Sequence, residues 1–395
     1  MAIAGTIELA RPGAIRLEVL PPLSLYVHMP WCVRKCPYCD FNSHEQKGDL
    51  PEEAYCAALI ADLEHALPWI WGRRVYSIFF GGGTPSLFAA SSIDRLLSAF
   101  RARITIAAGA EITLEANPGT FEAQKFRDFR AAGVNRLSIG IQSFDDAHLK
   151  ALGRIHSADE ARRAIRIAQD EFNNINLDLM YGLPLQTMDQ AEADIEEGIR
   201  WGTTHLSAYQ LTLEPNTVFY SHPPKLPAHD LAAEMQEHAE ALLADAGFEH
   251  YETSAFAKPG CRSRHNVNYW EFGDYLGLGA GAHGKISFPD RIERHARAKQ
   301  PREYMAMAPL GQSIVEQRRV ARADLPFEFM LNALRLIDGV PVALFRERTG
   351  LEISVVEAAL SKGESLGLLE RDWKTMRPTP QGQRFLNDLV ELFLA

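Results

Sequence analysis

A repeated alternation of apolar runs with helical stretches restricts the fold of this chain more than any other feature. Between residues 25 and 215, short apolar runs are followed by polar or glycine-rich breaks and then by segments with helical periodicity. This order predicts strands at 25–29, 77–80, 111–115, 136–141, 175–180 and 205–211, and helices at 51–67, 91–100, 120–132, 157–171 and 190–202. Such alternation predicts an α/β fold with a parallel sheet, either a partial (β/α)6 barrel or an open wound sheet.

Unusual polar residues follow these predicted strands. They are the segment 28–39, the glycine run 81–85, Glu115 with Asn117, Gln142, and Asp178. Parallel α/β folds place their active sites at the carboxyl ends of the strands. The pattern therefore predicts one site that is assembled from several strands.

Beyond Pro215 the alternation fades. Helical periodicity is present at 231–246, 324–336, 341–349 and 353–366, with a short hairpin at 371–377 and a final helix at 380–393. We therefore divide the chain into an N-terminal segment (1–20), a core barrel (21–246), a connecting segment (247–310) and a C-terminal mainly helical, winged-helix-like domain (311–395).

The net charge and the distribution of apolar residues limit which partners and which location we expect for this protein. A formal net charge of −10 argues against nucleic-acid binding by bulk electrostatics. The N-terminal residues lack the basic start and long apolar stretch of a signal peptide, and no segment reaches the roughly 18 apolar residues of a membrane span. We expect a cytoplasmic protein without a nucleic-acid partner, for which peripheral contact with a membrane acceptor stays open.

The cysteines indicate metal chemistry. They are Cys32, Cys36, Cys39, Cys56 and Cys261, and the first three form a C-x3-C-x2-C motif. Thiolates suit both iron–sulfur clusters and zinc, and three ligands on a four-iron cluster leave one iron open. The motif favours a cluster, and a zinc site completed by His28 or His44 is the alternative.

The segment 26–39, YVHMPWCVRKCPYC, resembles the cluster loop of the radical S-adenosylmethionine (SAM) superfamily. It is most similar to the branch that contains oxygen-independent coproporphyrinogen III oxidase. The resemblance implies a radical SAM barrel with a [4Fe-4S] cluster on the three cysteines of the motif. It also implies SAM on the open iron, and an electron donor that allows SAM cleavage to a 5′-deoxyadenosyl radical.

Further motifs resemble the same branch, namely GGGTP at 81–85, LEANPGT, SIGIQSF, LGRIH and DLMYGLP. Glycines allow close backbone approach to a ligand, and an arginine can pair with a carboxylate bidentately. Each residue alone is equally compatible with a tight turn or a solvent-facing charge. The resemblance implies SAM contacts from Tyr26, Gly82, Gly83, Thr84, Glu115, Gln142, Arg154 and Asp178, with Thr212 as a weaker candidate.

Two features bear on the subgroup. Phe41 stands where the oxidases of the branch carry a further cysteine, which argues against oxidase activity. The segment 265–270, HNVNYW, resembles the HNxxYW signature of the HemW subgroup of heme chaperones. This resemblance implies heme contacts from His265, Tyr269 and Trp270, with His283 and Cys261 as alternative ligands. The alternative is that the motif caps a turn and fills a core.

We therefore predict a chaperone that binds heme as cargo and delivers it to an unidentified acceptor protein. The second hypothesis is oxidative decarboxylation of coproporphyrinogen III by the same cofactors. The third is a DNA-binding regulator, with residues 355–366 as a recognition helix and 371–377 as a wing, and the low arginine content of that helix argues against it.

Overall fold

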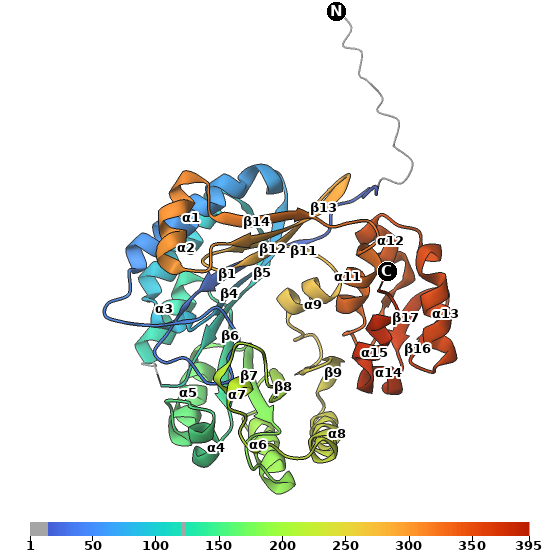
Figure 1. Ribbon diagram of the computed structural model, residues 1–395. Coiled ribbons are helices and arrows are strands. Elements are labelled where there is room, and N and C mark those ends of the chain that lie inside the picture. The colour runs from blue at the N-terminus through green and yellow to red at the C-terminus, as the bar shows by residue number, and fades with distance from the viewer. Residues whose placement is uncertain (1–14, 120–122, 395) are drawn as a thin grey trace, which may run out of the picture.

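A curved, twelve-stranded mixed sheet runs through the computed structural model, which describes residues 15–119 and 123–394 (Figure 1). Most of the predicted N-terminal segment 1–20 lies outside the described residues, and so does the start of the helix predicted at 120–132. No helix in the described part of the chain is long and apolar enough to cross a membrane.

Six neighbouring parallel strands form the central part of this sheet. They are β1 (Leu23–Met29), β4 (Arg74–Gly82), β5 (Thr105–Ala116), β6 (Arg136–Gln142), β7 (Ile175–Tyr181) and β8 (His205–Gln210). Each coincides with one of the six predicted strands. The prediction of an α/β fold with a parallel sheet is therefore confirmed.

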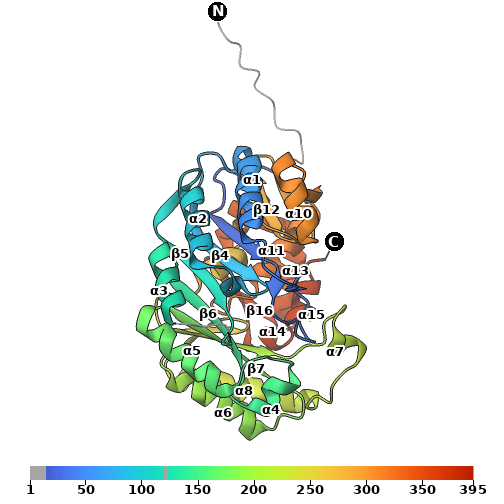
Figure 2. The same cartoon turned by 90° about the vertical axis from the view of Figure 1, so that its left-hand side faces the viewer.

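Amphipathic helices cover the outer face of the curved sheet (Figures 1 and 2). The larger ones are α1 (Glu52–Ile70), α2 (Ala90–Arg101), α3 (Ala123–Ala132), α5 (Ala158–Glu171), α6 (Met188–Arg200) and α8 (His229–Asp245). Two of them begin with a capping box, in which Ser157 and Thr187 exchange hydrogen bonds with the residue three positions later. Buried aliphatic and aromatic side chains between helices and sheet form the main core.

Six further strands extend the sheet at both ends, and the sequence analysis had not predicted them. At one end lie β11 (Asp274–Leu278), β12 (His283–Phe288), β13 (Arg291–Arg297) and β14 (Ile314–Arg319), and at the other lie β10 (Ala255–Ala257) and β9 (Glu249–Glu252). Strand β11 pairs with β1 in parallel, whereas β12 to β14 are antiparallel. Their apolar pattern is weak because they bury charged side chains, among them Arg297 beside Asp62.

The C-terminal part forms a separate small core on the other side of the sheet (Figure 1). It contains α11 (Leu325–Ala333), α12 (Val342–Thr349), α13 (Glu357–Ser365), α14 (Pro380–Arg384) and α15 (Leu386–Glu391). The predicted hairpin is confirmed as β16 (Leu369–Arg371) paired with β17 (Thr375–Pro378), and β15 (Val340–Pro341) completes a three-stranded sheet. The predicted final helix is divided in two at Phe385.

Candidate functional site

The three clustered cysteines lie on one loop that follows β1. Two short strands, β2 (Trp31–Cys32) and β3 (His44–Glu45), pair with each other and close the base of this loop. We call residues 32–45 the cluster loop. Its closed base holds all three thiols at the carboxyl end of the parallel strands, where the sequence predicted a site.

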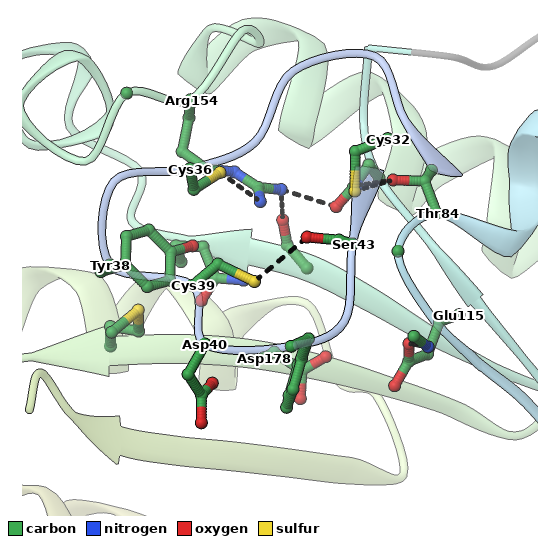
Figure 3. Close-up of a pocket in the computed structure, with 18 of the residues that line it drawn as sticks. Cys32, Cys36, Tyr38, Cys39, Asp40, Ser43, Thr84, Glu115, Arg154 and Asp178 are labelled. Atoms are coloured by element: carbon green, nitrogen blue, oxygen red, sulfur yellow. Dashed lines mark hydrogen bonds between the residues drawn. The ribbon is translucent and has the colours of Figure 1, made fainter. Parts of the chain in front are cut away.

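Hydrogen-bond donors surround the thiols (Figure 3). The Thr84 hydroxyl lies 3.6 Å from the sulfur of Cys32, an Arg154 guanidinium nitrogen lies 3.8 Å from that of Cys36, and the Ser43 hydroxyl lies 3.9 Å from that of Cys39. Such contacts stabilise the negative charge of metal-bound thiolates and tune the metal. The donor set therefore fits an iron–sulfur cluster.

The histidines of the zinc alternative have other partners. His28 uses both ring nitrogens, with the Tyr26 hydroxyl at 2.9 Å and the Asn42 carbonyl at 2.9 Å. One ring nitrogen of His44 lies 3.3 Å from the Lys299 carbonyl. In residues 15–119 and 123–394, no three His, Cys, Asp or Glu side chains converge on a single metal ion.

A cavity of about 370 Å³ opens beside the cluster loop, and we call it the cluster cavity. Most of the predicted site residues line it, namely Cys32, Cys36, Cys39, Gly82, Gly83, Thr84, Glu115, Gln142, Arg154, Asp178 and Thr212. All but Arg154 come from the cluster loop or from the carboxyl-terminal parts of β4 to β8 and the residues that follow them, and Arg154 comes from the segment just before α5. Tyr26 does not line this cavity and contributes to a second one, described below.

Two half-buried carboxyl groups give the cluster cavity its acidic character. Glu115 accepts a hydrogen bond from the Gly82 amide at 3.0 Å, and burial together with the nearby Asp178 raises its pKa to about 7. Asp178 accepts from the Ser138 hydroxyl at 3.0 Å and from the Asn176 amide at 2.8 Å. Burial also raises the pKa of Asp178. Both carboxyl groups can accept hydrogen bonds from a bound ligand.

A chain of hydrogen bonds joins two of the cysteines through Arg154. Its guanidinium also donates to the Asn117 side-chain oxygen and the Gly140 carbonyl, both at 2.7 Å. Asn117 in turn donates to Thr84 at 2.8 Å, and Thr84 contacts Cys32. No role was predicted for Asn117 from the sequence. Its place in the LEANPGT motif, two residues after Glu115, was the available signal.

Backbone conformation explains two glycines and one unusual residue at this site. A side chain on Gly82, whose φ is +116°, would meet the His28 ring at 2.5 Å, and one on Gly83 would meet the Trp31 carbonyl at 2.5 Å. Gln142 has a φ of +71° at the end of β6, a conformation that L residues rarely adopt. Glycine thus allows β4 to pack against the base of the cluster loop, and local strain occurs where the cavity is formed.

A second cavity, of about 850 Å³, lies between the cluster loop and strands β11 to β13. We call it the aromatic cavity because Tyr26, Phe41, Tyr269, Trp270, Phe272 and Tyr275 line it. The HNxxYW motif coincides with α9 (Arg264–Trp270), which brings Tyr269 and Trp270 to the wall. His283 lines this cavity as well, whereas His265 and Cys261 line neither cavity.

The two cavities share part of the cluster loop. Asp40, Phe41 and Ser43 line both of them, and we call these three residues the shared wall. Asn42 fixes this segment to the residues that follow β11 and β13, because its side-chain amide donates to the carbonyls of Ala280 and Lys299, both at 2.9 Å. The loop that carries the cysteines therefore also shapes the aromatic cavity.

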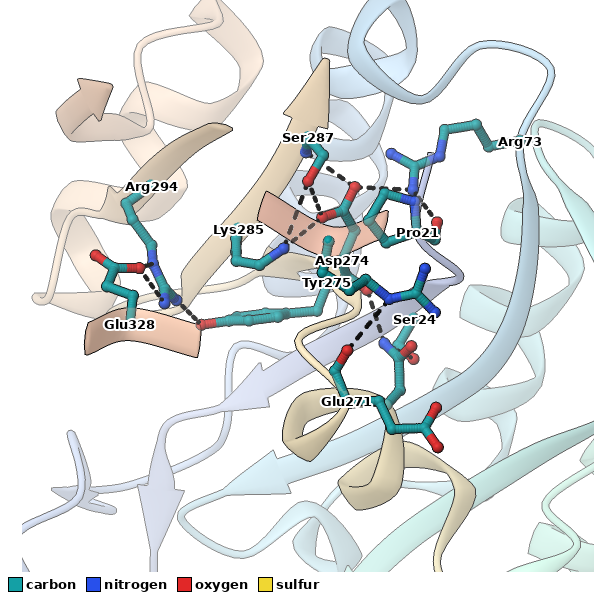
Figure 4. A network of polar contacts seen from close by, with 12 residues as sticks. Pro21, Ser24, Arg73, Glu271, Asp274, Tyr275, Lys285, Ser287, Arg294 and Glu328 are labelled. Carbon is teal, nitrogen blue, oxygen red and sulfur yellow. Dashed lines mark hydrogen bonds and ion pairs between the residues drawn. The ribbon is translucent and has the colours of Figure 1, made fainter. Parts of the chain in front are cut away.

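A buried ionic network supports the aromatic cavity from behind (Figure 4). Asp274 pairs with Lys285 at 2.7 Å and with Arg73 at 2.8 Å. Beside it, Arg294 donates to the Tyr275 hydroxyl at 2.7 Å and pairs at 2.7 Å with Glu328 of α11. Buried pairs of this kind hold their elements in one arrangement, because either partner alone is costly to bury. The network thus joins β11, β12 and β13 to the C-terminal helices.

Comparison with known proteins agrees with this geometry. Residues 26–197 match the model of the Radical SAM superfamily, and residues 320–385 match that of the HemN C-terminal domain. The chain is 49% identical to the heme chaperone HemW of Escherichia coli strain K12 over 378 residues, which cover 95% of this chain and 99% of the relative.

The chain belongs to the HemW family, within the radical SAM superfamily.

Two more proteins place this family among its relatives. A mouse protein, "Radical S-adenosyl methionine domain-containing protein 1, mitochondrial", is 37% identical over 93% of this chain and 86% of its own. Coproporphyrinogen III oxidase (HemN) from Escherichia coli has a similar structure, with a TM-score of 0.80 over 95% of this chain and 90% of its own, at 24% identity. This likeness shows the fold, a radical SAM α/β core with a HemN-type C-terminal domain. Membership of the superfamily also implies a [4Fe-4S] cluster and SAM.

Proposed function

We propose that this protein is a heme chaperone, which binds heme and transfers it to an acceptor protein. The observation that carries the proposal is a large aromatic and basic cavity directly beside the cluster loop, in a chain of the HemW family. Its volume of about 850 Å³ lies within the range of cavities that hold organic cofactors, about 300–1,000 Å³. Heme is a large, flat, apolar ring with two carboxylates, and such a wall suits it.

In this proposal the cluster cavity binds the iron–sulfur cluster and SAM, and the aromatic cavity binds heme. Cys32, Cys36 and Cys39 would hold the iron–sulfur cluster, which would supply an open iron for SAM. Arg154 is in place for the SAM carboxylate, and Glu115 and Asp178 for its hydroxyl and ammonium groups. The backbone of Gly82 and Gly83, the Thr84 hydroxyl and the Gln142 amide line the remainder of this pocket.

The heme contacts belong to the aromatic cavity. Tyr269 and Trp270 are half-buried on its wall, where their rings can pack on a porphyrin face. Tyr26 lies on the same wall, and its hydroxyl contacts His28. Tyr26 also lies near Glu115 of the cluster cavity, which supports the SAM contact that the resemblance implies for it. A cytoplasmic location, an electron donor to the cluster and contact with a membrane-bound acceptor complete the proposal.

Anaerobic hemin titration of the cluster-loaded protein tests the chaperone function, followed by mixing with apomyoglobin as a generic acceptor. We expect saturable binding with a shifted Soret band, and then the appearance of holomyoglobin. In parallel, coproporphyrinogen III, SAM and a strong reductant are added, and products are analysed by mass spectrometry. Catalytic formation of decarboxylated porphyrin, without stable hemin binding, would replace the chaperone proposal with the oxidase alternative.

A further inference from the structure

The histidine of the HNxxYW motif is enclosed by protein. The His265 side chain is about 1% exposed, and its ring stacks on Phe79 with 5.0 Å between centroids. One ring nitrogen lies 3.0 Å from the Ser77 hydroxyl and the other 3.1 Å from the Tyr269 hydroxyl. Binding of iron to this ring would require the loss of at least one of these buried hydrogen bonds. His265 is built to position Tyr269.

Three other histidines line the aromatic cavity, and they differ in what their rings contact. His28 is buried with both nitrogens engaged, and one nitrogen of His44 is engaged by the Lys299 carbonyl. His283, the first residue of β12, is exposed, and its ring forms no hydrogen bond within the described part of the chain. Of the three, His283 is therefore the histidine with both ring nitrogens open to a ligand in the described part of the chain, whereas His44 keeps one such nitrogen and His28 none.

The surroundings of His283 favour the neutral imidazole that binds iron. Partial burial lowers its pKa, and the positive charge of Lys299 lowers it further. Iron coordination needs the lone pair of an unprotonated ring nitrogen, so a neutral ring is the competent form.

The cationic side chains that line the aromatic cavity differ in whether an acidic partner neutralises them. Lys285 and Arg294 are neutralised by Asp274 and Glu328. The Lys299 side chain is exposed, and no ion pair engages its ammonium group in residues 15–119 and 123–394. Lys35 also lines this cavity without an ion pair among the described residues, and its ammonium group donates to the Phe41 carbonyl at 3.1 Å. Lys299 differs from Lys35 in lying close enough to His283 to lower the pKa of that ring.

We propose that His283 is the axial iron ligand of heme in the aromatic cavity, and that Lys299 pairs with one heme propionate. Tyr269 and Trp270 contact the porphyrin, and His265 fixes the Tyr269 hydroxyl without touching iron. This assignment rests on the proposed heme-chaperone function, whose failure is detected separately: in that case the wild-type protein shows no saturable hemin binding at all.

Hemin titration of four full-length proteins tests the ligand: wild type, His283→Ala, His265→Ala and His229→Ala. His229 is an exposed histidine at the start of α8, outside both cavities, and serves as the matched control. Electron paramagnetic resonance and the Soret position report the ligand. We expect H283A to lose the histidine-ligated spectrum and to bind hemin about tenfold or more weakly, as is usual for a lost metal contact.

The other variants make the result decisive. We expect H265A to bind more weakly but to keep the histidine-ligated spectrum, and H229A to match wild type. Added imidazole should restore the spectrum of H283A, which shows that its cavity is intact. A wild-type spectrum in H283A, or loss of the histidine-ligated spectrum in H265A alone, would overturn the assignment.

The propionate contact has its own test. We expect Lys299→Gln to weaken binding of hemin several-fold and to leave binding of hemin dimethyl ester unchanged, because the ester lacks the negative charges. Equal loss for both ligands, or no loss for either, would remove Lys299 from the proposal. Circular dichroism and the visible absorption of the reconstituted cluster confirm that each variant is folded.

Discussion

The two cavities share three wall residues and yet have opposite chemistry. The cluster cavity contains three thiols and two half-buried carboxyl groups, with Arg154 against the thiol of Cys36. The aromatic cavity contains six aromatic rings and four cationic side chains, with Asp40 as its acid among the described lining residues. SAM carries a net positive charge in its sulfonium and ammonium groups, whereas heme carries two carboxylates. The difference shows how one loop can separate a cationic ligand from an anionic one.

The largest effect is expected from Cys36→Ala, which should abolish the function of the cluster cavity and leave the aromatic cavity intact. Three thiolates are needed for the cluster, so the variant should lose all cluster absorption and labile sulfide. Hemin binding should persist, because Cys36 does not line the aromatic cavity. Cys261→Ala is the matched control, since Cys261 lines neither cavity. A full four-iron complement in C36A would refute the cluster assignment.

Asp274→Asn is expected to destabilise the strands that form the wall of the aromatic cavity, because it breaks the buried ionic network behind them. Asp274 is buried between Lys285 and Arg73, and breaking a buried pair costs about 3–5 kcal/mol of unfolding free energy. Burial opposes ionisation, but Lys285 and Arg73 hold the pKa of Asp274 below its usual value. Its contribution is therefore present above about pH 4 and is lost as the pH falls further.

Urea unfolding of the same variant gives the measurement. As a control, Glu370→Gln removes the exposed pair with Arg377 and should cost under about 1 kcal/mol. Hemin affinity should fall in D274N while cluster reconstitution is retained. Equal unfolding midpoints in D274N and wild type would contradict a structural role for this network.

The acidity of the cluster cavity predicts a pH dependence for SAM binding. The pKa of Glu115 is raised to about 7, so its carboxylate forms as the pH rises through neutrality. A cationic ligand binds the ionised form better, and SAM affinity should increase about tenfold between pH 6 and pH 8. Calorimetry on the cluster-loaded protein measures this. Glu115→Gln should remove the dependence, and a flat profile in wild type would refute it.

The smallest effect is expected from Asn42→Ala, which tests the shared wall. The variant loses two side-chain hydrogen bonds that fix the cluster loop to Ala280 and Lys299, at about 1 kcal/mol each. Thermal unfolding should show a modest decrease, and hemin affinity should fall a few-fold with the cluster still assembled. Gln46→Ala removes a surface hydrogen bond to Gly48 and is the matched control. If N42A and Q46A had the same unfolding temperature and the same hemin affinity, the shared wall would not contribute to the shape of the aromatic cavity.

The parallel part of the fold could be predicted because its signals are local. Apolar runs, capping residues and turns each act over a few neighbours, and they located all six central strands. Polar residues at the carboxyl ends of those strands then had to converge, as Glu115, Gln142 and Asp178 do. Strands β11 to β14 were not predicted because their apolar pattern is weak. In β13, for example, the charged Arg297 is buried against Asp62, a partner far away in the sequence.

The position of Tyr26 shows another limit. Side chains on a strand alternate between two faces, so Tyr26 and His28 share one face of β1, and both line the aromatic cavity. The resemblance predicts a SAM contact for Tyr26, but local sequence does not say that this face of β1 also lines a second cavity. That depends on β11, which pairs with β1 across more than 240 residues of chain.

By itself, the sequence determined the parallel βα core and the acidic residues at its strand ends, and it predicted the cysteine ligand set. All of these depend on neighbouring residues or on a motif of fixed spacing. Only the tertiary structure decided that a second cavity exists, that the cluster loop is its wall, and that His265 is enclosed while His283 is free. The physical reason is that hydrogen-bond occupancy and burial depend on distant partners, here Ser77 for His265, which no local pattern specifies.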